Sequence, residues 1–141
     1  MTIDLSILIV SWNVADLLAE CLDSIAAAPV QRVAPDSSTS SDSGPCVETI
    51  VVDSASSDGS VKMVRERYPW VHLIAEEDNI GFVRGNNRAL EVAQGRHLML
   101  LNPDTVVHGD ALNQLVDYLD AHPAVGIVGP QVLNDDGTTQ S

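Results

Sequence analysis

Three short polar segments of this sequence carry side chains suited to binding a charged ligand. They are residues 11–13 (Ser-Trp-Asn), 53–56 (Asp-Ser-Ala-Ser) and 102–104 (Asn-Pro-Asp), and each directly follows an apolar run of strand length. The carboxylate of Asp53 can accept a hydrogen bond from a pyrimidine N3–H or from a ribose hydroxyl. The carboxylate of Asp104 is a hard oxygen ligand for Mg²⁺ or Mn²⁺, which often take one or two protein carboxylates and complete their coordination with phosphate oxygens.

The same residues also suit ordinary turns. Asp53 is able to cap the turn that follows it, together with the serines that come next, and Asn-Pro-Asp is a favourable turn sequence. The sequence alone leaves both interpretations open.

A fourth polar segment, residues 78–87, contains two glycines, three asparagines and one arginine around an expected helix start. Glycine lets the backbone come close to a ligand, and the free N–H groups of a helix N-terminus suit an anion. Arg84 is one of few cations in the chain that could pair with a diphosphate. The alternative is an ordinary capped loop with an arginine at the surface.

The charge balance restricts the partners. Seven basic residues against 20 acidic ones give a formal net charge of −13, which argues against nucleic acids and anionic membranes because phosphate backbones require clusters of Lys and Arg. A phosphate-bearing ligand would need a local source of positive charge, such as a metal ion, a helix N-terminus or a well-placed arginine.

Several common sites and targeting signals are missing from the sequence. Neither G-x-G-x-x-G nor a P-loop follows the first strand, and the four histidines are scattered singly. Cys21 and Cys46 show no framework spacing, which favours a reduced, cytoplasmic protein. We find no signal peptide and no apolar stretch near the roughly 18 residues that cross a bilayer.

The elements that must position these segments alternate along the chain. Apolar runs predict strands over residues 3–11, 47–53, 71–75, 96–101 and 125–128. Helical spacing of apolar residues predicts helices over residues 14–26, 58–68, 82–94 and 110–119. We expect Asn13 and Asp110 to cap the first and last of these helices, and Gly95 to occupy the C′ position of the third.

This alternation favours an α/β fold with a mainly parallel sheet, flanking helices and right-handed crossovers. We expect one domain over residues 1–141, with an exposed, flexible, Ser-rich loop over residues 34–45. Ligands of such sheets bind outside the carboxyl ends of the strands, where the first three polar segments lie.

Four motifs in order resemble glycosyltransferase family 2, in its rhamnosyltransferase-like branch. The motifs span residues 9–13, 52–60, 79–87 and 101–105. The resemblance covers nearly the whole chain and implies the Rossmann-like, nucleotide-binding half of a GT-A glycosyltransferase.

The resemblance implies a donor site for a nucleoside-diphosphate sugar. The residues of this site are Ser11, Asn13, Asp53, Asn79, Gly81, Phe82, Arg84, Asn86, Asn87, Asn102 and Asp104. Asp53 would contact the base, which favours a UDP- or dTDP-sugar, and residues 79–87 would line the nucleotide and diphosphate. Asp104 matches the last aspartate of the family's D-x-D motif and would hold Mg²⁺ or Mn²⁺, whereas Asn102 replaces the first aspartate with a weaker ligand.

The resemblance also implies inverting transfer, with a carboxylate as general base. The final residues of this chain resemble the family's midpoint, so the base is expected beyond Ser141 and the fragment alone is expected to be inactive. In the full-length parent the acceptor would be a glycan or lipid-linked saccharide for cell-surface polysaccharide synthesis, at the cytoplasmic face of the membrane. An apolar surface normally covered by the second half would favour self-association.

Two other functions compete with this one. A sugar-nucleotide nucleotidyltransferase would need a glycine-rich, basic loop after the first strand, and residues 11–15 are neither glycine-rich nor basic. A non-enzymatic receiver-like domain with Asp53 as phosphoacceptor would need an acidic pair after the first strand and a lysine after the fifth, and both are missing.

Overall fold

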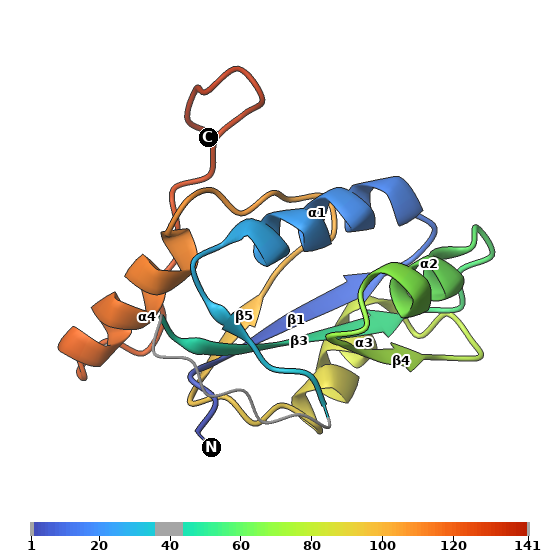
Figure 1. The fold of residues 1–141 in the computed structure, drawn as a ribbon, viewed down its shortest axis with the longest axis horizontal. Coiled ribbons are helices and arrows are strands. Elements are labelled where there is room, and N and C mark those ends of the chain that lie inside the picture. Colours follow the sequence, from blue (N-terminus) through green and yellow to red (C-terminus); the bar gives the residue numbers. More distant parts are fainter. Residues whose placement is uncertain (1, 36–43, 141) are drawn as a thin grey trace.

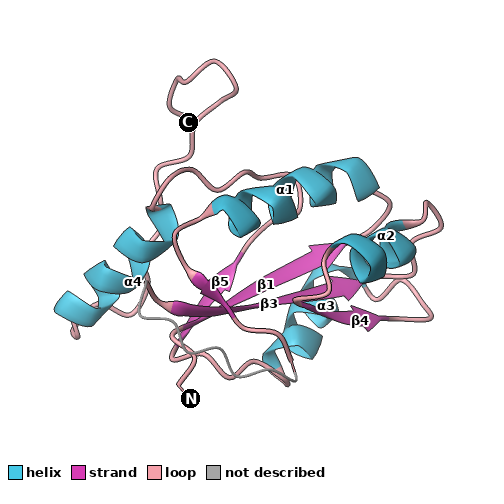
Figure 2. Cartoon of the chain, viewed as in Figure 1, coloured by secondary structure: helices cyan, strands magenta, loops and turns pink. Residues whose placement is uncertain are grey.

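The computed structural model of the protein describes residues 2–35 and 44–140. The Ser-rich loop expected over residues 34–45 lies mostly outside the described residues, so its expected flexibility stays a prediction. The described residues form five strands and four helices, which alternate along the chain except that β2 is followed directly by β3. Figures 1 and 2 show their arrangement. The strands are β1 (Leu5–Ser11), β2 (Gln31–Arg32), β3 (Cys46–Asp53), β4 (Val71–Ala75) and β5 (His97–Leu100). The helices are α1 (Ala15–Ala27), α2 (Ser60–Arg67), α3 (Gly81–Leu90) and α4 (Ala111–Ala121).

All the strand pairs are parallel, which confirms the predicted fold class. β3 pairs with β1 on one side, and on its other side with β2 near its start and with β4 along its second half. β5 pairs with the other side of β1. The register places Ser11 opposite Asp53, so β1 and β3 end level with each other.

Side chains alternate between the two faces of the sheet and build two cores. Leu5, Ile7 and Ile9 of β1 face a core that includes α1, α2 and α4, whereas Leu8 joins a smaller core with Ala89 of α3. The helices therefore cover both faces of the sheet (Figure 2).

α3 packs very closely on β1 because residue 85 is glycine. A Cβ atom built on Gly85 would lie 2.7 Å from Cγ1 of Val10. Any larger residue would push α3 away from the sheet, and with it the loop that precedes α3.

Three of the predicted helix ends are corrected by the structure. α1 has Val14 rather than Asn13 as its N-cap residue. Asp110 is the N-cap residue of α4, as predicted, but its side chain accepts a hydrogen bond from Gln114 instead of from a backbone N–H of the helix. α3 ends at Leu90, so Gly95 is not its C′ residue. Gly95 instead packs against β1, where a Cβ would lie 2.5 Å from the backbone N of Ser6.

The predicted fifth strand over residues 125–128 is wrong. These residues form no ladder with any described strand, and Ile127 is 92% exposed. An apolar run becomes a strand only where a neighbour can take its backbone hydrogen bonds. The two-residue β2 takes the position of an additional strand beside β3 and is too short to show a pattern in the sequence.

None of the helices in the described part of the chain combines the length and the apolar character that crossing a membrane requires.

Candidate functional site

The three polar segments expected at the site follow β1, β3 and β5, which are adjacent in the sheet in the order β3-β1-β5. Figure 1 shows β1 and β3 running side by side in the same direction. Because the three strands are parallel, Ser11 at the end of β1, Asp53 at the end of β3 and the segment 102–104 after β5 lie toward the same edge of the sheet. The topology therefore brings together groups that are far apart in the sequence.

Ser11 and Asp53 are both 1% exposed, and each keeps a polar atom without a partner. The Ser11 hydroxyl and Asp53 Oδ1 have no hydrogen bond within the described residues. The other oxygen of Asp53 accepts a hydrogen bond from the backbone N–H of Ser56 at 2.8 Å. One carboxylate oxygen of Asp53 thus caps the turn that follows β3, as the alternative interpretation of the sequence proposed. The other oxygen can still accept a hydrogen bond from a ligand.

Asn13 ties two loops together. Its side-chain oxygen accepts a hydrogen bond from the N–H of Ser57 at 2.8 Å, and its own N–H donates to the Ser56 hydroxyl at 2.9 Å. The residue adopts a left-handed conformation with φ of 51°. Its amide is therefore engaged in holding the end of β1 beside the loop after β3.

Asp58 is a structural residue of the site that the sequence did not identify. Its carboxylate accepts hydrogen bonds from the N–H of Ala15, the first residue of α1, at 3.0 Å, and from the N–H of Ser60, the first residue of α2, at 3.1 Å. Hydrogen bonding, above all from the Ser60 hydroxyl, lowers the pKa of Asp58 below its ordinary value of 3.8. One side chain caps two helices, and the contact to α1 depends on a partner 43 residues away that no local pattern reveals.

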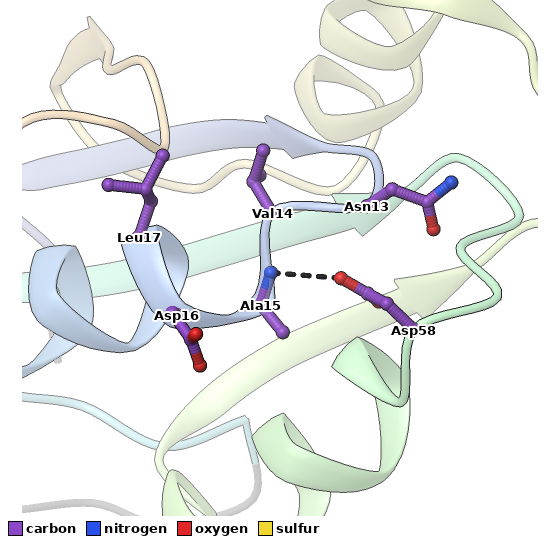
Figure 3. Close-up of a pocket in the computed structure, with 6 residues that line it drawn as sticks. All are labelled: Asn13, Val14, Ala15, Asp16, Leu17 and Asp58. Atoms are coloured by element: carbon purple, nitrogen blue, oxygen red, sulfur yellow. Dashed lines mark hydrogen bonds between the residues drawn. The ribbon is translucent and has the colours of Figure 1, made fainter.

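An open hollow of about 370 Å³ lies beside this cap. Its walls are Asn13, Val14, Ala15, Asp16, Leu17 and Asp58, shown in Figure 3. Asn13 is the one residue of the expected donor site that lines it. With two carboxylates in its wall, the hollow borders the site rather than offering a place for a diphosphate.

The loop before α3 is anchored to the end of β3 by Ser54, which is 1% exposed. The Ser54 hydroxyl donates to Oδ1 of Asn79 at 2.9 Å and accepts from the N–H groups of Ile80 and Gly81. These two amides, expected to be free for an anion, are already used. Ser54 was quoted in a motif of the sequence but was not assigned to the site.

The side chains of the 79–87 segment separate into two groups. Asn79 accepts hydrogen bonds within the loop, and the buried Asn86 donates to the carbonyl of Phe82 at 3.1 Å. Phe82 is 57% exposed, and Arg84 and Asn87 are also exposed. Arg84 forms no ion pair within the described part of the chain, whereas Arg88 on the same helix pairs with Glu76. Arg84 is thus a cation of this segment that is available for a phosphate.

Asn102 and Asp104 lie on the exposed turn that follows β5. The backbone carbonyl of Asn102 accepts hydrogen bonds from the N–H and hydroxyl of Thr105, which makes the segment a turn, and Asp104 has no hydrogen bond within the described residues. The turn passes over α1, where burial raises the pKa of the Cys21 thiol to about 11, so the thiol stays protonated and can donate to the Asn102 carbonyl.

A metal ion at this turn would depend on its ligand for most of its coordination. The described residues contain no cluster of three His, Cys, Asp or Glu side chains that could hold an ion. The Asp104 carboxylate and the Asn102 amide are hard oxygen donors, a set that fits Mg²⁺ or Mn²⁺ when phosphate oxygens supply the remaining ligands.

Comparison with known proteins finds a matching family and several similar proteins. The model of the family described as glycosyl transferase family 2 matches residues 6–141. The chain is 31% identical over 101 residues to the putative teichuronic acid biosynthesis glycosyltransferase TuaG of Bacillus subtilis (strain 168), a match that covers 68% of this chain and 40% of TuaG.

The names of two further similar proteins specify a sugar. The N-acetylglucosaminyl-diphospho-decaprenol L-rhamnosyltransferase of Mycobacterium tuberculosis (strain ATCC 25618 / H37Rv) is 26% identical over 103 residues, covering 65% of this chain and 34% of that protein. The solved structure of the mannosyltransferase PcManGT from Pyrobaculum calidifontis, in complex with GDP-Man and Mn²⁺, superimposes with a TM-score of 0.66 at 28% identity, covering 84% of this chain and 33% of that one. The chain spans between 33% and 40% of the length of these three relatives.

Proposed function

Because the chain belongs to glycosyltransferase family 2, we propose that it forms the part of a glycosyltransferase that binds the sugar donor, a nucleoside-diphosphate sugar. The observation that carries the proposal is the pair of unpartnered buried atoms, the Ser11 hydroxyl and Asp53 Oδ1, at the shared carboxyl edge of β1 and β3. Leaving a buried polar group unsatisfied costs about 1–3 kcal/mol, a cost that a bound ligand removes. The lone oxygen of Asp53 suits the N3–H of uracil or thymine, so the donor class is a UDP- or dTDP-sugar.

The diphosphate of the donor lies between Arg84 and Asp104 in this proposal. Both side chains are exposed and form no ion pair or hydrogen bond within the described residues. Arg84 precedes Gly85, which packs against Val10 near the end of β1, and Asp104 follows β5, which pairs with β1. Arg84 offers a planar cation to the phosphate oxygens. Asp104, assisted by Asn102, would hold Mg²⁺ or Mn²⁺, and such an ion would supply Lewis-acid stabilisation of the negative charge on the diphosphate.

The chemical step needs a group outside these 141 residues. We expect inverting displacement at the anomeric carbon, with a carboxylate beyond Ser141 as the base for the acceptor hydroxyl. The acceptor is a glycan or a lipid-linked saccharide, and the parent protein works in cell-surface polysaccharide synthesis at the cytoplasmic side of the membrane. The acceptor class is supported by two relatives, because TuaG is named for teichuronic acid biosynthesis and the name of the L-rhamnosyltransferase contains a lipid-linked saccharide.

Thermal unfolding with a panel of nucleotides tests the donor site. UDP, dTDP, GDP, ADP and NAD are added with and without Mn²⁺ to the wild type, to Asp104→Asn and to the matched control Asp117→Asn. Asp117 is an exposed aspartate of α4, so its substitution removes the same charge away from the site. A ligand at 100 times its Kd stabilises the folded state by about 2.7 kcal/mol.

We expect a Mn²⁺-dependent rise in Tm with UDP or dTDP that is lost in Asp104→Asn and kept in Asp117→Asn. A larger rise with GDP would correct the base assignment while supporting the donor site. A rise that survives in Asp104→Asn would contradict the role of Asp104, and no rise with any nucleotide would contradict donor binding by this chain.

A further inference from the structure

The hydrogen bonds of Ser54 indicate a role beyond the residues that would touch the donor. Ser54 is the first residue after β3, next to Asp53, and its backbone N–H donates to the carbonyl of Ser11 at 2.9 Å. Its side chain is buried, with 1% of the residue exposed. The residue is therefore held firmly at the shared end of β1 and β3.

The Ser54 hydroxyl caps a helix that belongs to another part of the chain. α3 begins at Gly81, and Ile80 before it provides no side-chain cap. The hydroxyl accepts from the N–H of Ile80 at 2.7 Å and of Gly81 at 3.3 Å, while it donates to Asn79 Oδ1 at 2.9 Å. The N–H of Ile80 is thus satisfied by a residue 26 positions earlier in the chain, and the N–H of Gly81 is shared between Ser54 and Asn79 Oδ1, which lies at 3.0 Å.

This contact links two parts of the proposed donor site. On one side it is adjacent to Asp53, assigned to the base, and on the other it holds the first turn of α3, which carries Arg84, assigned to the diphosphate. Apolar packing also holds this region on the sheet, since Gly85 lies against Val10 and Ile80 packs against the core that contains Leu8. These apolar contacts resist separation from the sheet, whereas the directional hydrogen bonds of Ser54 join the start of the turn to the end of β3. Ser54 therefore forms a hydrogen-bonded link between the strand end that carries Asp53 and the helix that carries Arg84.

We infer that Ser54 is a positioning residue: its hydroxyl holds the start of α3 at the end of β3 so that Asp53 and Arg84 bind one nucleoside diphosphate together. This inference rests on the proposed function. Ser54 need not touch the donor, because its effect passes through the loop of residues 79–81. The inference also implies that the N–H groups of Ile80 and Gly81 donate to side chains of the protein and do not bind the phosphate.

Three variants test the inference. Ser54→Ala removes the hydroxyl, and Ser54→Thr keeps it. Ser6→Ala is the matched control, because Ser6 is equally buried and its hydroxyl accepts a backbone hydrogen bond from Gly95 at 2.8 Å, but in the first half of β1. Amide hydrogen exchange of Ile80 and Gly81 reports the loop without any ligand, and calorimetry with UDP and Mn²⁺ reports donor affinity.

In Ser54→Ala we expect exchange at Ile80 and Gly81 to accelerate about tenfold more than exchange in β1 and β3, and the Kd for UDP to rise about tenfold. Ser54→Thr should restore both values toward those of the wild type. Ser6→Ala should destabilise the fold to a similar extent with an unchanged Kd.

Unchanged exchange at Ile80 and Gly81 would overturn the inference, and so would faster exchange with an unchanged Kd, since the hydroxyl would then be only structural. An equal rise of the Kd in Ser6→Ala would also overturn it. If the wild type binds UDP too weakly to measure, calorimetry is repeated with dTDP and GDP. If it binds none of the three, the proposed function fails together with the positioning role, and the exchange data alone then report whether Ser54 anchors the loop.

Discussion

Ser11 and Thr49 present the same chemical situation at two different places in the sheet. Each is about 1% exposed, and each keeps a hydroxyl that has no hydrogen-bond partner within the described residues. Ser11 lies at the carboxyl end of β1, whereas Thr49 lies inside β3, opposite Ile7. A comparison of the two separates the cost of an unsatisfied hydroxyl from its use in binding.

Replacing Ser11 with Ala should stabilise the free protein and weaken donor binding. The variant removes an unpaired buried hydroxyl, so the free energy of unfolding should rise by about 1 kcal/mol. The variant also loses a hydrogen bond to the ligand. Because one hydrogen bond contributes about 1 kcal/mol net, the Kd for UDP should rise several-fold. Chemical denaturation and calorimetry measure the two quantities.

Thr49→Val is the control for this pair of effects. It removes a similar hydroxyl with little change in volume, so it should stabilise the fold to a similar extent and leave the Kd for UDP unchanged. If Ser11→Ala also leaves the Kd unchanged, Ser11 has no part in the site.

At the scale of the elements, the loop of residues 54–58 connects three helices to the sheet. Ser54 caps α3, and Asp58 caps both α1 and α2. None of these helices has a side-chain cap from its own N-cap residue. Helix N-termini leave N–H groups that need partners, and this loop provides them from the end of β3.

Loss of one N-cap typically costs about 1 kcal/mol. Because Asp58 caps two helices, we expect Asp58→Ala to lower the free energy of unfolding by about 1–2 kcal/mol in total. The pKa of Asp58 is lowered in the folded state, so the carboxylate stabilises the fold above its unfolded pKa, near 3.8, and this contribution is lost as the pH falls through the lower folded value. The difference in unfolding free energy between wild type and Asp58→Ala should be constant near neutral pH and shrink below about pH 4.

Asp16→Ala is the control for Asp58, because Asp16 is an exposed acidic residue in the first turn of α1 whose side chain forms no hydrogen bond or ion pair within the described residues. It loses only the favourable interaction with the helix dipole, about 0.3–1 kcal/mol. Equal destabilisation in the two variants at neutral pH would mean that the hydrogen bonds of Asp58 contribute little.

At the scale of the whole molecule, β5 is a sheet edge within the described part of the chain. It pairs with β1 alone, and Leu98 and Leu100 are 51% and 60% exposed. An edge strand with exposed apolar side chains favours pairing with another chain. The net charge of −13 opposes the approach of a second copy.

We predict that the protein self-associates through β5 and that added salt strengthens the association, because salt screens the repulsion between copies. The molar mass from light scattering should rise with protein concentration, and more steeply at high salt. Leu98→Thr combined with Leu100→Thr should keep it monomeric, whereas Val106→Thr, another exposed apolar residue, should not. A single monomeric mass at all concentrations and salt levels would refute this prediction.

The fold class and the location of the site could be predicted because they depend on local patterns. Apolar runs identified β1, β3, β4 and β5, and the alternation with helices required a parallel sheet whose polar strand ends meet at one edge. The run at residues 125–128 failed as a strand because pairing is not a local property. Gly95 was misassigned for a similar reason, since its role is a close contact with Ser6 on a distant strand.

By itself, the sequence determined the positions of four strands and four helices, the family and the edge of the sheet at which a ligand can bind. These follow from periodicity and from motifs, and both are written along the chain. The tertiary structure alone decided which polar groups of that edge are still free to bind. Asn13, Asn79 and the amides before α3 are engaged by the loop after β3, while Asp53 keeps one oxygen unpaired. Hydrogen bonds between distant residues depend on how the strands and helices pack, and no local pattern records them.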